Sequence, residues 1–293
     1  MRKWWVSPWM QQLIFTGPAA AVYAIIIAVP VVLCIYYSFT SWNGISGQVT
    51  WVGLDNYKKI LSADKQFYSS FWFTFRYMLA VLVFTNALGF AFAYLLSKPL
   101  KSRNVLRTLL FMPNVLGGLL LGFIWQFIFV QGFATLGKMT DLAFFNLQWL
   151  GTATTSYWAL VIVSIWQGAG YLMVIYIAGL TNVPADLLQA AEIDGAKSWQ
   201  ILRHIILPLI MPAITVCLFL TISWAFKSFD LNFSLTKGGP FRSSESISMN
   251  IYNEAFQNNN YGLGTTKAFI FFIVVMIVTS IQVAVTKKKE VEM

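Results

Sequence analysis

Residues 71–96 read FWFTFRYMLAVLVFTNALGFAFAYLL and carry a single charged side chain, Arg76. A helix needs about 20 apolar residues to cross the roughly 30 Å hydrocarbon core of a bilayer, so this stretch predicts a transmembrane helix. Similar windows recur along the chain. The predicted spans are Leu13–Phe39, Phe71–Leu96, Leu109–Val130, Tyr157–Leu180, Ala213–Phe233 and Ala268–Val285. The sequence thus predicts an all-α integral membrane protein with six transmembrane helices and one domain, residues 1–293.

The composition agrees with a membrane protein. Of 293 residues, 58% are hydrophobic and 11% are charged, and the mean hydropathy is +0.66. Because a soluble domain carries about 25% charged residues, this composition excludes an ordinary soluble enzyme. Two cysteines in apolar stretches, Cys34 and Cys217, and one histidine, His204, offer no disulfide framework and little metal or acid-base chemistry.

The net charge of +9, from 20 basic and 11 acidic residues, is interpreted as a topology signal. The basic residues flank apolar stretches instead of forming the single stripe that nucleic-acid binding favours. With both termini inside, the inner segments hold eleven Lys and Arg residues and the outer loops hold six. The positive-inside rule therefore predicts a multi-pass protein of the prokaryotic cell membrane with both termini in the cytoplasm.

The segment between the fourth and fifth spans, residues 181–212, differs from the other loops. Pro184 and Asp186 suit the first turn of a helix, and Gly195 suits its end. Apolar residues at helical spacing then continue to Pro208. The pattern predicts a short helix, a glycine turn and a second short helix at the membrane face. An amphipathic helix resting on lipid headgroups is the alternative interpretation.

This segment also carries a family resemblance. It resembles the EAA loop of the permeases of binding-protein-dependent ABC importers, and most closely the carbohydrate-uptake branch. The residues that match, and that the resemblance assigns to contact with an ATPase, are Gln189, Ala190, Ala191, Asp194, Gly195, Ala196, Trp199, Leu207 and Pro208. Gln189 stands where the family usually has Glu, so the charge at this position is lost. Further matches are residues 39–42, 52–57 and 235–240.

The resemblance implies a fold, partners and a mechanism. It implies the type I ABC importer permease fold with a cytoplasmic helix-turn-helix coupling segment, residues 181–212. The implied partners are a second, different permease, two cytoplasmic ATPase subunits, an extracytoplasmic solute-binding protein and a carbohydrate substrate. The sequence has no G-x-x-x-x-G-K-[ST] phosphate loop. We therefore expect a transport subunit that is not itself an enzyme and has no cofactor of its own, with ATP bound by the partner ATPase subunits.

Polar side chains inside the predicted spans are candidates for a substrate path, because such groups are costly in lipid and usually face a cavity or protein. The candidates are Asn86, Asn114, Gln126, Trp166, Gln167, Tyr171, Trp224, Lys227 and Asp230. Lys227 and Asp230, three residues apart on an expected helix, could pair and neutralise each other instead. Gln167 could equally hold a contact between helices beside Gly168 and Gly170.

Two other functions compete with an ATP-driven importer. A secondary transporter coupled to an ion or proton gradient would need a relay of acids, and Asp230 is the only acid placed in a span. An integral-membrane enzyme would need a catalytic constellation, which a single histidine does not supply. The resemblance therefore favours uptake of a mono- or oligosaccharide by alternating access, and the motifs do not identify which sugar.

Overall fold

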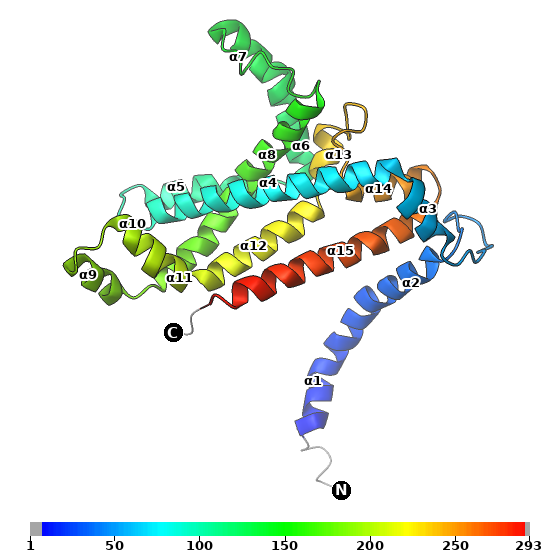
Figure 1. Cartoon of the computed structure of the whole chain (residues 1–293), viewed down its shortest axis with the longest axis horizontal. Helices are drawn as coiled ribbons and strands as arrows, with labels where there is room; N and C mark the ends of the chain where they lie inside the picture. Colours follow the sequence, from blue (N-terminus) through cyan, green and yellow to red (C-terminus); the bar gives the residue numbers. More distant parts are fainter. Residues whose placement is uncertain (1–7, 291–293) are drawn as a thin grey trace. The chain divides into compact units, whose positions relative to one another are not determined.

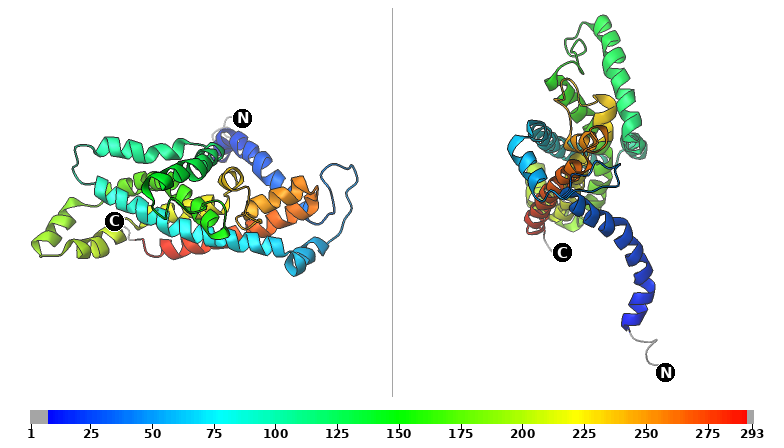
Figure 2. Two further views of the ribbon diagram at one scale, coloured as in Figure 1. Left: turned by 90° about the horizontal axis from the view of Figure 1, so that it is seen from above. Right: turned by 90° about the vertical axis from the view of Figure 1, so that its right-hand side faces the viewer.

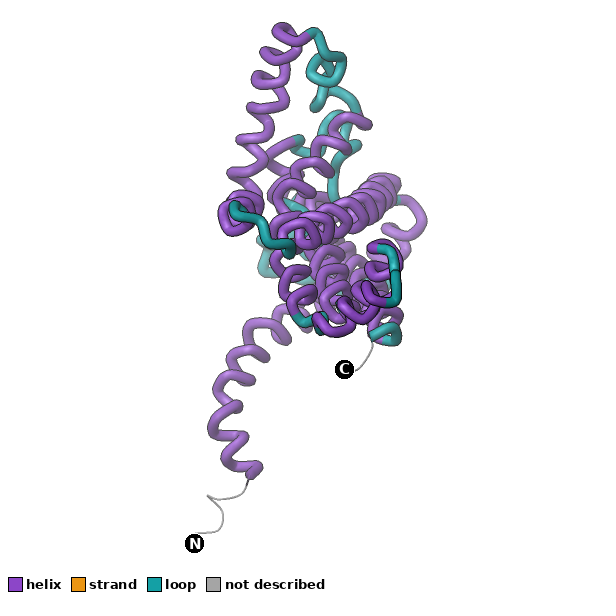
Figure 3. Tube along the Cα trace, turned by 90° about the vertical axis from the view of Figure 1, so that its left-hand side faces the viewer, coloured by secondary structure: helices purple, strands orange, loops and turns teal. Residues whose placement is uncertain are grey.

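The computed structural model describes residues 8–290, and this part of the chain consists mainly of helices joined by loops (Figures 1 and 3). Five helices in it are long and apolar enough to span a membrane: Pro8–Ser38, Lys65–Leu96, Gly118–Thr140, Ala153–Thr181 and Tyr261–Lys287. A bent pair, Ser198–Leu209 and Met211–Phe226, brings the number to six. The predicted all-α membrane fold is confirmed. The described residues form two compact units, 8–64 with 251–272 and 65–250 with 273–290.

The first unit begins with a long helix that has almost no partner within the unit. Helix α1 (Pro8–Tyr23), a π-helical turn (Ala24–Ala28) and α2 (Val29–Ser38) are continuous, and Ser38 is their one buried residue. Since a helix that is apolar on all sides belongs in lipid or against another chain, this segment suits a membrane span. The first predicted span is therefore confirmed.

Hydrogen bonds fasten the end of α2 to the rest of the first unit. Helix α3 (Asp55–Ala63) presents Asn56, whose Nδ2 donates to the carbonyls of Ser38 (3.0 Å) and Thr40 (2.8 Å). The Thr266 hydroxyl on α15 (Tyr261–Lys287) also donates to the Ser38 carbonyl, at 2.8 Å. These bonds satisfy the carbonyls that a helix leaves free at its end. They give motif residues in 39–42 and 52–57 a structural role.

A buried ion cluster completes the first unit. Lys267 on α15 is 1% exposed, and its Nζ lies 2.8 Å from Asp64 Oδ2 and 2.8 Å from Glu254 Oε2. Glu254 belongs to a π-helical turn (Asn253–Gln257) that follows α14 (Ile247–Tyr252). Because a buried charge is tolerated only when it is paired, the two carboxylates account for a lysine in this position.

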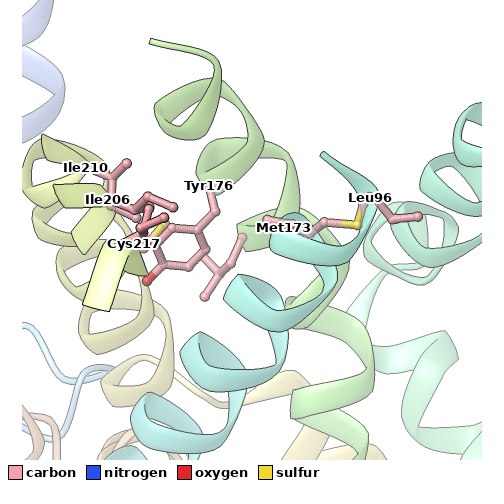
Figure 4. Packing of buried hydrophobic residues seen from close by; sticks show 9 residues of the cluster. Leu96, Met173, Tyr176, Ile206, Ile210 and Cys217 are labelled. Carbon is pink, nitrogen blue, oxygen red and sulfur yellow. The ribbon is translucent and has the colours of Figure 1, made fainter. Parts of the chain in front are cut away.

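The second unit is built around α4 (Lys65–Leu96) and α8 (Ala153–Thr181), which pack against each other and against α12 (Met211–Phe226). The α4 backbone comes close to α8 at Gly89, where an added Cβ would lie 2.9 Å from Leu172 Cβ. A buried apolar cluster fills the end of the bundle near α10 (Figure 4). Its members are Ala93, Leu96, Leu172, Met173, Tyr176, Ile201, Ile206, Ile210 and Cys217. Cys217 is thus a free, buried packing residue, as predicted.

The third predicted span, Leu109–Val130, is misplaced. Helix α5 (Arg103–Phe111) ends in a 3-10 turn (Met112–Val115), and residues Leu116 and Gly117 are extended. A new helix then runs through α6 (Gly118–Phe127), a π-helical turn (Ile128–Gly132) and α7 (Phe133–Thr140) (Figure 2). Pro113 lacks the N–H that would continue the first helix, so the apolar run is broken in its middle.

The fifth predicted span, Ala213–Phe233, is also different. Helices α9 (Ala185–Ile193), α10 (Ser198–Ile201) and α11 (Leu207–Leu209) precede it, and the chain bends by 72° between Leu209 and Met211. Helix α12 then ends at Phe226, and a separate short helix, α13 (Asp230–Leu235), follows. The fifth apolar run is therefore a bent and interrupted span. The second, fourth and sixth predicted spans correspond to α4, α8 and α15 and are confirmed.

Candidate functional site

A cavity of about 320 Å³ lies in the second unit, where α12 stops and the chain passes to α13. Its size falls within the range of small-molecule sites in proteins. The lining comes from α4, the broken third span, α8 and the connection from α12 to α13. The lining residues are Tyr77, Asn114, Gly118, Ser164, Gln167, Gly168, Trp224, Lys227, Ser228, Phe229, Asp230 and Leu231. Five of the nine predicted path residues are among them.

The two charged residues of the cavity do not form the ion pair that was one of their two interpretations. Lys227 caps the end of α12, whereas Asp230 begins α13, so the helix that would have placed them one turn apart is interrupted between them. Within residues 8–290 no ion pair joins the two side chains, and both are exposed. The cavity therefore has an ammonium group and a carboxylate available for hydrogen bonds to a ligand.

Tyrosine and serine hydroxyls line the α4–α8 side of the cavity. The Ser164 hydroxyl donates to the Leu160 carbonyl at 2.8 Å, so the single proton of Ser164 is already committed. The Tyr77 hydroxyl, 2.5 Å from Ser164 Oγ, must therefore donate to Ser164. The Ser228 side chain also lies within hydrogen-bonding reach of the Tyr77 hydroxyl, so these three hydroxyls form one cluster on this side of the cavity.

Gln167 and Ser228 are held in place by hydrogen bonds to residues at the helix interruptions around the cavity. Gln167 Nε2 donates to the carbonyl of Leu116 at 3.0 Å, in the extended segment that interrupts the third span. Ser228 Oγ donates to Asn232 Oδ1 at 2.8 Å. Each anchor uses one polar atom and fixes the side chain, which leaves the Oε1 of Gln167 and the lone pairs of Ser228 for other partners. Gln167 thus combines both predicted roles, helix contact and cavity lining.

Gly168 allows the one indole ring of the cavity to lie against α8. A Cβ added at Gly168 would come 2.7 Å from Cζ2 of Trp224 and 2.8 Å from its Cη2. Any larger residue would therefore displace this ring. The cavity then presents one aromatic ring together with an ammonium, a carboxylate, amides and hydroxyls. Such a set can pack on the apolar face of a polar molecule and hydrogen-bond its hydroxyl groups.

The other four predicted path residues lie outside the cavity lining. Asn86 is buried and bonds to its neighbours: it donates to Leu82 O (2.8 Å) and Thr221 Oγ1 (3.1 Å) and accepts from Tyr176 (2.8 Å). Trp166 meets Trp125 edge-on, Tyr171 packs near Trp224, and Gln126 is half-buried on α6. Asn86 therefore links α4, α8 and α12 by hydrogen bonds, which is a structural role.

Sequence reasoning missed Tyr77 and Ser164, whereas Ser228 stood out as part of the polar run from Trp224 to Asn232 in the predicted fifth span. Hydroxyl side chains are frequent in transmembrane helices, where they bond the carbonyl one turn back, as Ser164 does. No pattern in the sequence separates a serine that faces a cavity from one that faces a neighbouring helix.

The segment 181–212 has one packed face and one exposed face. Leu188, Ala191 and Ala196 pack against the apolar cluster, whereas Gln189, Ala190, Asp194 and Trp199 are exposed. Gly195 lies between α9 and α10 with a φ of +75°, a left-handed conformation that glycine adopts without strain. Its amide donates to Glu192 O at 3.1 Å, and the Ala196 amide donates to Ala191 O at 2.9 Å, so the turn closes the end of α9.

The second half of this segment connects to α12 through a bend. A π-helical turn (Leu202–Ile206) precedes Leu207 and Pro208, both half-buried, and the 72° bend follows at once. Proline and π-helical turns are the usual causes of bent helices. The exposed face of α9 and α10 is therefore joined to the helix that ends at the cavity.

The fold and the site together define a membrane-embedded transport subunit. The family described as binding-protein-dependent transport system inner membrane component matches residues 85–291. The chain belongs to this family. It is a permease subunit of an ABC importer, and its membrane helices are the multi-pass part of such a system.

Individual relatives agree with this family. The probable starch degradation products transport system permease protein AmyD of Thermoanaerobacterium thermosulfurigenes is 44% identical over 280 residues, covering 96% of this chain and 95% of the relative. The multiple sugar-binding transport system permease protein MsmF of Streptococcus mutans is 35% identical, covering 87% of this chain and 88% of the relative.

Solved structures share the fold. A chain of a bacterial ABC transporter involved in the import of the acidic polysaccharide alginate superposes with a TM-score of 0.80 at 17% identity, covering 95% of this chain and 96% of that chain. Another, from the alginate transporter in complex with an alginate pentasaccharide-bound periplasmic protein, has a TM-score of 0.78 at 17% identity, covering 93% and 92%. None of these comparisons supports the ion-coupled alternative.

Proposed function

We propose that this chain carries a neutral mono- or oligosaccharide across the membrane, and that the 320 Å³ cavity is part of the path. The 44% identity to the starch degradation products permease, over nearly the whole of both chains, is the observation that carries the proposal. The cavity supports it independently, because Trp224, two charged groups and several hydroxyls are the groups that bind sugars. Lys227 and Asp230 together contribute no net charge, which favours a neutral sugar.

We propose that segment 181–212 couples the chain to a cytoplasmic ATPase. Ile193 is 86% exposed and Trp199 is 64% exposed, so two large apolar side chains have no cover within residues 8–290. Exposed apolar residues on a small helical pair indicate a partner surface. The bend at Leu209–Met211 would transmit a displacement of this pair to α12, at whose far end Trp224 and Lys227 lie.

The assembly we propose contains a second, different permease, two ATPase subunits that bind the ATP, and a solute-binding protein outside the cell. The orientation follows the positive-inside count, with both termini in the cytoplasm. The loops around 43–68 and 237–266 would then receive the binding protein. Since ATP binds to the partners, this chain needs no cofactor and has no ATPase site of its own.

Co-purification and reconstitution test the assembly and the activity together. We expect the tagged chain, extracted from its native membrane, to retain one further permease and an ATPase. In proteoliposomes this complex should take up sugar only with internal ATP and external binding protein. Uptake by this chain alone, driven by an ion gradient, would refute the proposal.

Two substitutions then test the cavity. Trp224→Ala should raise the sugar concentration for half-maximal uptake, because it removes the ring on which the sugar packs. Trp166→Ala is the matched control, since Trp166 is a membrane tryptophan of α8 that does not line the cavity. Equal effects of the two substitutions would show that the cavity is not the path.

A further inference from the structure

A second polar cavity, of about 370 Å³, lies between the first half of α4 and the start of α8. Its lining includes Arg76 and four hydroxyl residues, Ser69, Thr154, Tyr157 and Ser243. It shares no lining residue with the cavity assigned to the sugar. Arg76 is the only charged residue of its lining, so the cavity carries a net positive charge.

The guanidinium of Arg76 has spare hydrogen-bonding capacity. Its described contact is a 3.4 Å bond from Nε to the carbonyl of Trp72, and within residues 8–290 no acidic side chain forms an ion pair with it. An arginine offers five N–H donors in a fixed fork, which matches the oxygens of a phosphate group. Nearly all of these donors are therefore available to an anion.

The start of α8 adds further donors. The Thr152 hydroxyl caps the helix by accepting from the Thr155 amide at 3.2 Å. Ala153 and Thr154, both lining the cavity, occupy the first two helical positions, whose amides have no acceptor within a helix. The start of this 29-residue helix also bears partial positive charge.

A buried hydroxyl beside the cavity is also unpaired. Ser243 Oγ is closed off from solvent and lacks a hydrogen-bond partner within residues 8–290. Such a group costs free energy unless something bonds to it. Because this oxygen is closed off, Ser243 lines the cavity through its other atoms, and the proposed ligands are Arg76 and the start of α8.

The position of Arg76 along α4 places the cavity at the level of the lipid headgroups, which are its nearest source of phosphate groups. Arg76 lies about 20 residues before Leu96, where α4 ends, and 20 helical residues span roughly 30 Å, the thickness of the hydrocarbon core. Trp72 and Trp158, each next in sequence to a residue that lines the cavity, are 56% and 42% exposed, as tryptophans at a membrane boundary commonly are. Arg76 therefore lies at headgroup level, in the leaflet opposite segment 181–212.

We propose that this cavity binds the phosphate of an anionic phospholipid headgroup, with Arg76 as the main ligand and the start of α8 as a second. If segment 181–212 is cytoplasmic, as proposed above, the cavity faces the outer leaflet. The proposal of lipid binding does not depend on this orientation. A free phosphate ion or an anionic sugar presents similar chemistry, and the experiment must separate these sources from the lipid.

The test uses the purified importer that contains this chain. Short-chain phosphatidylglycerol, inorganic phosphate and short-chain phosphatidylcholine are titrated separately while thermal unfolding is followed. We expect phosphatidylglycerol to raise the unfolding midpoint, with at least tenfold weaker apparent affinity in Arg76→Gln. Arg103→Gln is the matched control, because it removes an exposed arginine at the other end of the bundle. Ser243→Ala should leave the lipid effect unchanged, because the Ser243 hydroxyl oxygen is closed off from the cavity.

Three outcomes would overturn the proposal. Equal stabilisation by inorganic phosphate would identify the site as one for a soluble anion, and equal loss in Arg76→Gln and Arg103→Gln would indicate non-specific charge attraction. An effect of phosphatidylcholine that matches phosphatidylglycerol in every variant would show that the lipid acts only through its apolar chains. None of these experiments measures sugar uptake. If lipid binding is refuted, the proposal of sugar transport is therefore unaffected, and if sugar transport is refuted, the proposal of lipid binding is unaffected.

Discussion

Substitution of Gly195 separates the folding of this chain from its action on a partner. Gly195 has a φ of +75°, and an added Cβ would meet no atom of residues 8–290 within 4 Å, apart from its two chain neighbours. Alanine and tryptophan at this position therefore incur the same backbone cost, roughly 1–2 kcal/mol for an L-residue in the left-handed region. Asparagine tolerates this conformation better and costs less. Any further difference between the alanine and tryptophan variants must come from another chain.

The assay compares Gly195→Asn, Gly195→Ala and Gly195→Trp in reconstituted importer. Thermal unfolding of the alanine and tryptophan variants should agree to within about 0.5 kcal/mol, as is usual for an exposed site without contacts. We expect Gly195→Trp to lower uptake per ATP hydrolysed at least tenfold relative to Gly195→Ala, because the large ring would enter the ATPase surface. The asparagine variant should stay close to the unsubstituted protein.

The result that refutes this reasoning is a tryptophan variant that couples hydrolysis to uptake as well as the alanine variant. That outcome would mean that the turn between α9 and α10 faces water or lipid in the assembled importer. Segment 181–212 would then match the alternative interpretation, an amphipathic helix pair on lipid headgroups.

Three other predictions follow from specific contacts. Lys267→Met should destabilise the protein by about 3–5 kcal/mol, because it removes the buried ammonium that neutralises Asp64 and Glu254. Lys58→Met, which removes an exposed 3.5 Å ion pair, should cost at most about 1 kcal/mol in the same thermal unfolding assay. Lys227→Met and Asp230→Leu should each weaken sugar uptake. Since no ion pair joins the two side chains, the free-energy changes calculated from uptake should add to within about 0.5 kcal/mol in the double variant. A larger departure from additivity would contradict the finding that the two groups are unpaired. Asn86→Leu should lower the unfolding midpoint but leave the sugar concentration for half-maximal uptake unchanged, and a large change in that concentration would place Asn86 on the path.

The breaks in the third and fifth spans show where prediction from the sequence failed. Hydropathy is continuous from Leu109 to Val130, so an apolar window cannot register the extended residues Leu116 and Gly117. The helix that begins at Gly118 continues through α7 to Thr140, beyond the predicted end at Val130. Its last part is held by packing of Phe133 against Trp149 in the following loop. That packing joins residues of different elements and is a tertiary effect.

The candidate site divides in the same way. Amides, charges and tryptophans inside apolar stretches are conspicuous, and for this reason Asn114, Gln167, Trp224, Lys227 and Asp230 could be found as candidates. The relative positions of these side chains could not be predicted from the sequence, because a helix was expected to continue through Lys227 and Asp230. The end of α12 at Phe226 turns what would have been a self-neutralised pair into two groups that line a cavity.

The sequence by itself determined the class of this protein: its scarcity of charge demands lipid, the number of apolar windows matches the spans, and the residues around Gly195 identify the family. These are local properties, set by the length and composition of one segment at a time. The tertiary structure alone decided which polar side chains share a cavity and which, like Asn86, bond to neighbouring helices. Such choices depend on the rotation and interruption of helices that are far apart in the chain, and no single segment encodes them.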